Sequence, residues 1–255
     1  MSMNKVCLVT GGCSGLGLAT AQKFAGKGYT LALFDMNEAE GPKAAKSLGN
    51  NSSFYKVDVT NEAQVKSAVE QVLATHKRID VLVNSAGISL VGLVVNRKGI
   101  VGNTKTFQKV LEVNVIGTFN VAKYVALAMT TQTPVGDYKQ RGVIINVGSV
   151  AGDEGQNGQT YYAASKGAIH AMSLPMARDL GKWGIRVVAI APGIIRTPMG
   201  NAMPEKVTKT LVDATALGRF GEAEEFADTV WGITGSTYMT GNVVRMDGGI
   251  KFPKL

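Results

Sequence analysis

The sequence predicts an α/β fold built on one doubly wound parallel sheet with helices on both faces. Short apolar runs rich in β-branched residues alternate with longer helical segments almost from end to end. A glycine-rich turn joins the first run to the first helical segment. This alternation is typical of parallel strands connected by right-handed crossover helices.

Strands are expected where the apolar runs are nearly continuous, as they are in strands buried on both faces of a sheet. These runs are Lys5–Thr10, Thr30–Asp35, Phe54–Val59, Ile79–Asn84, Gly142–Val147, Ile185–Ala191 and Asn242–Met246. Helices are expected between them, near residues 15–28, 38–48, 61–77, 104–131, 159–183 and 222–235. No linker or repeat divides the chain, so residues 1–255 are interpreted as a single domain.

Composition limits the classes of protein to which this chain can belong. Hydrophobic residues make up 45% of the chain and charged residues 18%, as in a folded globular protein. Two cysteines provide no disulfide framework, which favours a reducing compartment. No apolar run reaches the roughly 18 residues of a membrane span, and the first strand starts too early for a cleavable leader. The net charge of +8 is spread along the chain rather than gathered in a stripe, which argues against direct nucleic-acid binding.

The turn after the first strand has the features of a phosphate-binding loop. Gly11, Gly15 and Gly17 follow the spacing G-x-x-x-G-x-G between the first strand and the first helix. Glycines allow the backbone to turn tightly and to approach a pyrophosphate, while the helix N-terminus offers free N–H groups. Ser14 and Leu16 complete the expected contacts. The alternative is a turn without a ligand, because a chain with 31 glycines produces such matches by chance.

Asp35 stands at the end of the second strand and predicts the choice of cofactor. An acidic residue roughly 20 residues after the glycines accepts hydrogen bonds from the adenosine ribose of NAD. It would also repel the additional phosphate of NADP, and no arginine or lysine lies between Leu31 and Lys43 to bind that phosphate. NAD is therefore the expected cofactor. The alternative is that Asp35 only caps the following helix.

A second group of polar residues predicts proton transfer. Tyr162 and Lys166 lie four residues apart, on one face of an expected helix. The usual tyrosine pKa near 10 is too high for a good base at neutral pH, and a neighbouring ammonium with a positive nicotinamide would lower it. Ser149, after the fifth strand, could hold a substrate oxygen beside the phenol. Asn114 lies among apolar neighbours, either as a satisfied buried amide or as the holder of a water linked to Lys166.

Two further segments follow the ends of strands, where doubly wound folds bind ligands. The fourth strand ends in Asn-Ser-Ala-Gly, next to the expected nicotinamide, and the sixth leads into Pro-Gly-Ile-Ile-Arg-Thr, which could orient its carboxamide. The cofactor contacts expected there are Asn84, Ala86, Gly87, Pro192, Gly193, Ile195 and Thr197, together with Tyr162 and Lys166. The two histidines, His76 and His170, lack the spacing of metal ligands, so no metal is expected.

The chain resembles the short-chain dehydrogenase/reductase family over its whole length. The shared motifs occur in the family's order: T-G-x-x-x-G-x-G, D, D-V, N-S-A-G, N, S, Y-x-x-x-K and P-G-x-x-x-T. The resemblance implies a Rossmann-type fold and NAD as cofactor. It implies as catalytic positions Ser149, Tyr162, Lys166 and Asn114. It also assigns Asp58 and Val59 to the adenine ring, unless Asp58 is only a cap at the end of a strand.

Whole segments are most similar to the type-2 3-hydroxyacyl-CoA dehydrogenases, which are also described as 2-methyl-3-hydroxybutyryl-CoA and 17-beta-hydroxysteroid dehydrogenases. These segments include QRGVIINV, ARDLGKWGIRVVAIAPGIIRTPM and GNVVRMDGGI. The resemblance implies hydride transfer between NAD(H) and the 3-hydroxyl or 3-oxo carbon of a short or branched acyl-CoA. It further implies a homotetramer in the mitochondrial matrix, with the cytoplasm as the alternative. Left open are an NADPH-dependent 3-oxoacyl-carrier-protein reductase, a hydroxysteroid dehydrogenase and, outside the enzymes, a scaffold or RNA-associated subunit.

Two long segments beside the expected cleft, 89–103 and 197–215, are interpreted as substrate loops. Their apolar residues could wall an acyl chain: Leu90, Val91, Leu93, Val94, Val95, Met199, Met203, Val207 and Leu211. Their basic residues could meet the phosphates of coenzyme A or be only solvated charges: Arg97, Lys98, Lys206 and Lys209. The piece Met203–Leu211 is expected to act as a lid that admits the thioester.

Overall fold

The computed structural model describes residues 5–49, 51–197 and 205–251. Its strands are β1 (Val6–Thr10), β2 (Thr30–Asp35), β3 (Ser52–Lys56), β4 (Val81–Asn84), β5 (Gly142–Val147), β6 (Ile185–Pro192) and β7 (Val243–Met246). Its helices are α1 (Gly15–Gly26), α2 (Gly41–Ser47), α3 (Glu62–His76), α4 (Thr104–Leu111), α5 (Thr118–Thr131), α6 (Thr160–Gly181), α7 (Glu205–Asp213) and α8 (Ala223–Gly235). A π-helical stretch, η1 (Glu112–Gly117), joins α4 to α5, and a 3-10 turn, η2 (Val150–Gly152), follows β5.

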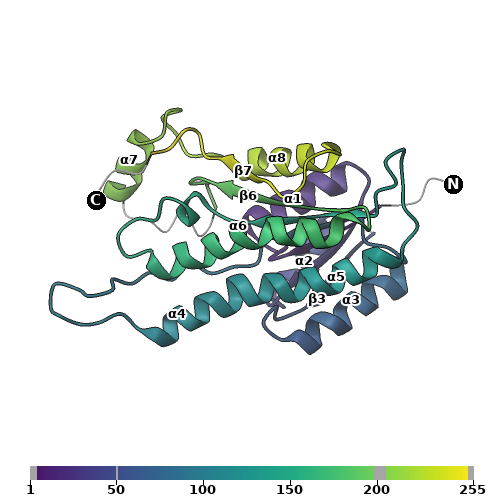
Figure 1. The fold of residues 1–255 in the computed structure, drawn as a ribbon, viewed down its shortest axis with the longest axis horizontal. Coiled ribbons are helices and arrows are strands. Elements are labelled where there is room, and N and C mark those ends of the chain that lie inside the picture. The colour runs from purple at the N-terminus through teal and green to yellow at the C-terminus, as the bar shows by residue number, and fades with distance from the viewer. Residues whose placement is uncertain (1–4, 50, 198–204, 252–255) are drawn as a thin grey trace.

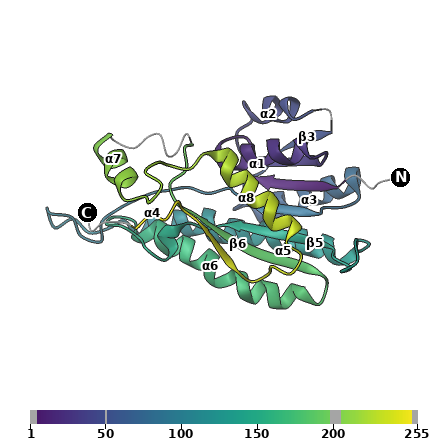
Figure 2. The ribbon, with the colours of Figure 1, turned by 90° about the horizontal axis from the view of Figure 1, so that it is seen from above.

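The strands form one parallel sheet in the order β3-β2-β1-β4-β5-β6-β7. Helices α1, α2 and α8 cover one face, and α3, α5 and α6 cover the other (Figures 1 and 2). The predicted doubly wound parallel sheet is confirmed. Chain order reverses between β1 and β4, and folds of this type bind ligands at that point, outside the carboxyl ends of the strands.

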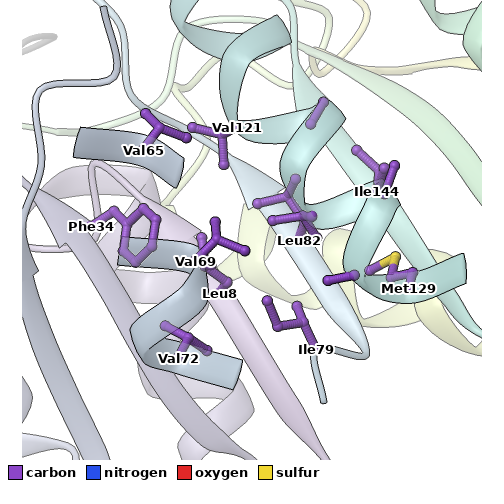
Figure 3. Packing of buried hydrophobic residues seen from close by; sticks show 14 of the residues in the cluster. Leu8, Phe34, Val65, Val69, Val72, Ile79, Leu82, Val121, Met129 and Ile144 are labelled. Carbon is purple, nitrogen blue, oxygen red and sulfur yellow. The ribbon is translucent and has the colours of Figure 1, made fainter. Parts of the chain in front are cut away.

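The core has two layers because successive side chains of each central strand point to opposite faces of the sheet. Leu8 of β1 packs with Val69 of α3 and Val121 of α5 in one layer (Figure 3). The next residue, Val9, packs in the other layer with Phe226 of α8. Both faces of β1 are therefore buried, which explains why its residues from Val6 to Val9 are all apolar.

The third strand lies earlier in the chain than predicted. The sequence favours Phe54–Val59, but β3 runs over Ser52–Lys56. Its register ends where Asp35 pairs with Lys56, since β2 itself ends there and offers no further partner. Asp58 and Val59 consequently lie in the loop beyond the strand, not at its end.

The long helix predicted over residues 104–131 is continuous in direction but widens in the middle. The π-helical stretch η1 replaces ordinary α-helical turns, and the hydroxyl of Thr118 donates to the carbonyl oxygen of Asn114 at 2.8 Å. π-helical turns often occur at functional sites, and this one holds Asn114. The run Thr104–Thr131 has the length and apolar character of a membrane-spanning helix, yet half of its most apolar window is buried within the protein, as in a core helix.

Candidate active site

The glycine-rich loop leads from the carboxyl end of β1 into the N-terminus of α1. Gly11 has a φ of +62°, and a Cβ there would lie 3.0 Å from the Cα of Ala86. A Cβ at position 17 would lie 2.2 Å from the carbonyl oxygen of Gly11, so only glycine allows α1 to approach the loop this closely. Ser14, the N-cap residue of α1, is exposed and makes no capping hydrogen bond with its side chain. The loop has the geometry of an anion cradle, with backbone N–H groups of α1 at its end.

The Asp35 carboxylate ties the glycine-rich loop to the chain after β2. Its oxygens accept hydrogen bonds from the backbone N–H groups of Cys13, at 3.1 Å, and Asn37, at 3.0 Å. The N-cap residue of α2 is Glu40, so the alternative that Asp35 caps this helix is wrong. Burial, followed by the charge of Asp35, raises the pKa of the Cys13 thiol to about 12. Cys13 is therefore a protonated, buried side chain that fills space in the loop.

Thr10, the first residue of the T-G-x-x-x-G-x-G motif, fixes the loop after β4, a role that the motif does not predict. The hydroxyl oxygen of Thr10 accepts hydrogen bonds from the backbone N–H groups of Ser85, at 3.1 Å, and Ala86, at 3.0 Å. Asn84 donates its side-chain amide to Asn146 of β5 at 3.0 Å. These contacts hold the predicted Asn-Ser-Ala-Gly segment directly beside the glycine-rich loop. The parallel pairing of β1 with β4 brings Thr10 and this segment together, and no local pattern in the sequence reveals that contact.

Ser149 and Tyr162 meet although they lie on different elements. Ser149 is the N-cap residue of η2, and its Oγ accepts a hydrogen bond from the backbone N–H of Ala151 at 3.1 Å. Tyr162 lies in the first turn of α6, and its side chain is hydrogen-bonded to that of Ser149. Two hydroxyl groups thus converge after the carboxyl end of β5. A substrate oxygen placed there could interact with both.

Lys166 is buried one turn beyond Tyr162. Its Nζ donates to the carbonyl oxygen of Val147 at 2.8 Å and lies 5.6 Å from the centroid of the Tyr162 ring. Burial lowers the pKa of Lys166 to about 8 and raises the pKa of Tyr162, while the Ser149 hydrogen bond acts on Tyr162 in the opposite direction. In the chain by itself burial raises the Tyr162 pKa, so the expected lowering of this pKa by Lys166 together with a bound, positively charged nicotinamide stays a prediction. Enclosure disfavours the charged form of both side chains.

Asn114 is a buried and well-satisfied amide. Its Oδ1 accepts from the backbone N–H of Ile88 at 2.8 Å, and its Nδ2 donates to the Ile88 carbonyl at 2.9 Å and to the Ser165 hydroxyl at 3.0 Å. A Cβ at position 87 would lie 3.1 Å from Oδ1 of Asn114 and 3.7 Å from Nζ of Lys166. The two predicted catalytic side chains therefore approach the same point beside Gly87.

The segment after β6 returns to the glycine-rich loop. Gly193 donates its backbone N–H to Met246 of β7 at 2.9 Å, just after Pro192 ends the strand. Ile195 is buried and forms an isolated bridge with Gly221. The side chain of Thr197 would lie 3.6 Å from a Cβ on Gly15. Two predicted cofactor contacts that are far apart in the sequence, Gly15 and Thr197, thus lie side by side.

Asp58 and Val59 make contacts of a mainly structural kind. Oδ1 of Asp58 accepts from the backbone N–H and the hydroxyl of Thr60, at 2.9 and 2.7 Å, as in a turn cap. The carbonyl oxygen of Val59 accepts from the side-chain amide of Asn120 at 3.1 Å. Their assignment to an adenine ring stays a prediction. Leu16, also predicted to contact the cofactor, packs half-buried against the core layer beneath α1.

The two predicted substrate loops reach the same end of the molecule (Figures 1 and 2). Residues 89–103 form an arm closed by an antiparallel bridge between Val95 and Val101, and the predicted acyl-contacting side chains on it are exposed. In the second loop, Leu211 is buried, so it belongs to the packing of α7. Met199 and Met203 lie outside the described residues, and with them the beginning of the predicted lid.

The residues around the β1–β4 reversal fit a nicotinamide dinucleotide. The glycine cradle suits a pyrophosphate, Asp35 provides an acceptor after β2, and the Ser149–Tyr162 pair lies beyond β5. Within the described ranges, no three His, Cys, Asp or Glu side chains are grouped so that they could hold a metal ion. The hydroxyl groups of Ser149 and Tyr162 provide groups for acid–base chemistry beside the nucleotide cradle.

Comparisons with known proteins agree with this geometry. A family model described as short chain dehydrogenase matches residues 5–208. The chain is 45% identical over 248 residues to 3-hydroxyacyl-CoA dehydrogenase type-2 of Homo sapiens, covering 96% of this chain and 95% of that protein. It is 40% identical over 251 residues to a 3-oxoacyl-acyl-carrier-protein reductase of Thermotoga maritima, covering 96% and 97%.

A solved structure shows the same relationship in three dimensions. The crystal structure of 3-hydroxyacyl-CoA dehydrogenase type-2 from Mycobacterium avium is similar with a TM-score of 0.93 and 31% identity, covering 99% of this chain and 98% of that chain. The match extends over the elements that carry the glycine cradle, Ser149 and Tyr162. The chain therefore belongs to the short-chain dehydrogenase family, as an oxidoreductase that works with a nicotinamide cofactor on a small-molecule substrate.

Proposed function

We propose that this dehydrogenase transfers a hydride between NAD(H) and the 3-hydroxyl or 3-oxo carbon of a short or branched acyl-CoA. The observation that carries the proposal is the hydrogen bond between Ser149 and Tyr162, because it directs two hydroxyls to one substrate oxygen. The acyl-CoA class is supported by relatives that carry the name 3-hydroxyacyl-CoA dehydrogenase type-2, at 45% and 31% identity.

Tyr162 is the proposed general acid and base. During oxidation its deprotonated form takes the proton of the substrate hydroxyl, and during reduction its phenol returns a proton to the carbonyl oxygen. Ser149 holds the same oxygen and keeps it within reach of Tyr162. A bound nicotinamide supplies or accepts the hydride. The glycine cradle and the segment after β6 would hold and orient it.

Lys166 and Asn114 are proposed to connect Tyr162 to solvent. With a pKa near 8, Lys166 can gain and lose a proton close to neutral pH. Asn114 and Lys166 both approach Gly87, where a Cβ would lie 3.1 Å from Oδ1 of Asn114 and 3.7 Å from Nζ of Lys166. A water at this point would complete the link, since Asn114 Oδ1 can accept a second hydrogen bond.

NAD is proposed over NADP because of Asp35. The carboxylate lies after β2, and Lys43, the next basic residue along the chain, forms an ion pair with Glu40. An additional phosphate beside Asp35 would meet a like charge, which typically costs several kcal/mol.

Replacing Asp35 with alanine and Met36 with arginine is therefore expected to shift kcat/KM from NAD toward NADP by roughly tenfold or more. Met36 is exposed, so the arginine can be accommodated without repacking. The single change Met36→Arg is the matched control, because it adds the charge but keeps the carboxylate. Equal kcat/KM values for NAD and NADP in the unaltered enzyme would contradict the proposal.

A substrate panel tests the acyl-CoA assignment. We expect the highest kcat/KM for acetoacetyl-CoA or 2-methyl-3-hydroxybutyryl-CoA, lower values for longer acyl-CoA thioesters, and the lowest for a steroid alcohol and a simple secondary alcohol. The exposed apolar arm of residues 89–103 supports an acyl-chain contact near the site. Much faster turnover of the steroid or the simple alcohol than of every thioester would overturn the assignment but not the family.

An acyl-carrier-protein reductase is the second candidate, because a relative of that name is 40% identical to this chain. The same panel separates the two functions when a 3-oxoacyl-carrier-protein and NADPH are included. Asp35 favours the NAD-dependent enzyme, and a preference for the carrier protein with NADPH would reverse this choice.

The chain is further proposed to be a single-domain subunit of a homotetramer in the mitochondrial matrix. Exposed apolar side chains on η1 and α5 support subunit packing: Ile116, Phe119 and Leu127. Two unpaired cysteines and a pI near 9.4 suit a reducing, alkaline compartment. Light scattering of the purified protein and fractionation of cells test these two proposals separately.

A further inference from the structure

The imidazole of His170 is buried beneath the turn that carries Ser149. His170 lies on α6, one helical turn beyond Lys166, and its side chain is only 8% exposed. A Cβ at position 148 would lie 2.4 Å from its Nε2, and a Cβ at position 152 would lie 2.8 Å from its Cε1. The ring therefore fills the space that these two glycines leave on either side of the Ser149 turn.

Asp153 holds this ring from the outer side. Its Oδ1 lies 3.2 Å from Nδ1 of His170, and Asp153 immediately follows η2. Nε2 is buried and has no hydrogen-bond partner in the described part of the chain. A buried polar nitrogen without a partner costs free energy, so an apolar side chain would fill the space at lower cost. What the imidazole adds is a polar edge that Asp153 can fix in one orientation.

The turn above the ring determines where the Ser149 hydroxyl lies. Oγ of Ser149 accepts from the N–H of Ala151, so the hydroxyl follows any shift of η2. η2 is pressed against α6, because a Cβ at position 152 would lie 2.9 Å from the backbone nitrogen of Gly167. Tyr162, the partner of Ser149, is on the same helix. The distance between the two hydroxyls therefore depends on how the turn rests on α6.

We propose that His170, fixed by Asp153, is a positioning residue that sets Ser149 Oγ against Tyr162 for proton transfer. The inference rests on the proposed role of Ser149 as the side chain that holds the substrate oxygen. His170 touches the turn at both glycines, so removing the imidazole allows the turn to settle toward α6. A displacement of the order of 1 Å in such a group can cost about 10²-fold in rate.

The test is a double-mutant cycle between His170 and Ser149, measured as kcat with acetoacetyl-CoA and NADH. His170→Ala is expected to lower kcat by about 10- to 100-fold while the Kd for NADH stays within about twofold. In the Ser149→Ala background the same change should have little further effect, because a residue that acts only through Ser149 has nothing left to position. His170→Asn, which retains a donor toward Asp153, should recover most of the loss.

Two further variants keep the test decisive. Asp153→Ala frees the ring at a half-exposed position without opening the core, and it should lower kcat in the same direction even if His170→Ala does not fold. His76→Ala is the matched control: His76 also has a buried, unpartnered Nε2, but it lies in the last turn of α3. Its kcat should equal that of the unaltered enzyme.

The outcomes separate this inference from the proposed function. If Ser149→Ala keeps normal kcat, the proposed role of Ser149 is wrong. If Ser149→Ala is impaired but the two single effects multiply in the double variant, His170 does not act through Ser149. Unchanged kcat in both His170→Ala and Asp153→Ala would also overturn the positioning role.

Discussion

Replacing Tyr162 with phenylalanine is expected to lower kcat by about 10²–10⁴-fold, or by more, and to leave NADH binding nearly unchanged. The change removes the only atom that we propose exchanges a proton with the substrate, while the ring keeps its place over Nζ of Lys166, 5.6 Å from the ring centroid. Ser149 alone cannot replace the phenol, because an unassisted serine hydroxyl is a much weaker acid than tyrosine. Turnover is followed by NADH absorbance and binding by NADH fluorescence titration.

Tyr161→Phe is the matched control for this experiment. Tyr161 directly precedes Tyr162, but its ring stacks on Phe107 at a centroid distance of 5.3 Å. Its hydroxyl is buried and has no hydrogen-bond partner among the described residues, so its removal should leave kcat within about twofold and should not lower stability. If Tyr162→Phe retains near-normal kcat, the proton is handled by another group.

The largest effect on folding is expected from Asp80→Ala. Asp80 and Arg78 form a charge pair in which each side chain is only 8% exposed, with an Nη2–Oδ1 distance of 2.6 Å. The other carboxylate oxygen accepts the backbone N–H of Val6 at 2.8 Å, at the beginning of β1. The substitution removes the carboxylate that pairs with the buried Arg78 guanidinium. It also removes the acceptor of the Val6 N–H in β1. Breaking one side of such a pair costs about 3–5 kcal/mol.

The free energy of unfolding from urea denaturation at a fixed protein concentration tests this expectation. Glu40→Ala is the control, since Glu40 forms an exposed ion pair with Lys43 that should contribute at most about 1 kcal/mol. Asp80→Asn retains an acceptor for the Val6 N–H, so its loss in the free energy of unfolding should lie between the losses of Asp80→Ala and Glu40→Ala. A loss below about 1 kcal/mol for Asp80→Ala would show that the pair does not hold β1 and β4 in place.

Local patterns alone predicted the order of the strands and singled out several candidate site residues. The run at residues 30–35 matches β2 at both ends, because its four central residues are all apolar, as expected of a strand buried on both faces. The glycine spacing after β1 likewise indicates positions where the backbone leaves no space for a side chain. Gly17 is such a position, because a Cβ there would clash with the carbonyl oxygen of Gly11. Tyr162 was singled out by its spacing to Lys166 on a predicted helix, and Ser149 by its place after a predicted strand.

Only the tertiary structure decided what these residues meet. The bonds of Thr10 to the loop after β4, and the packing of His170 beneath the Ser149 turn, join segments that no periodicity connects. The effect of burial on the Tyr162 pKa likewise could not be read from the sequence, since it depends on the surrounding fold rather than on the spacing to Lys166. The spacing of residues along a helix predicts which side chains are neighbours on that helix. Whether water reaches a charged side chain depends on every element packed around it, and therefore on the complete fold.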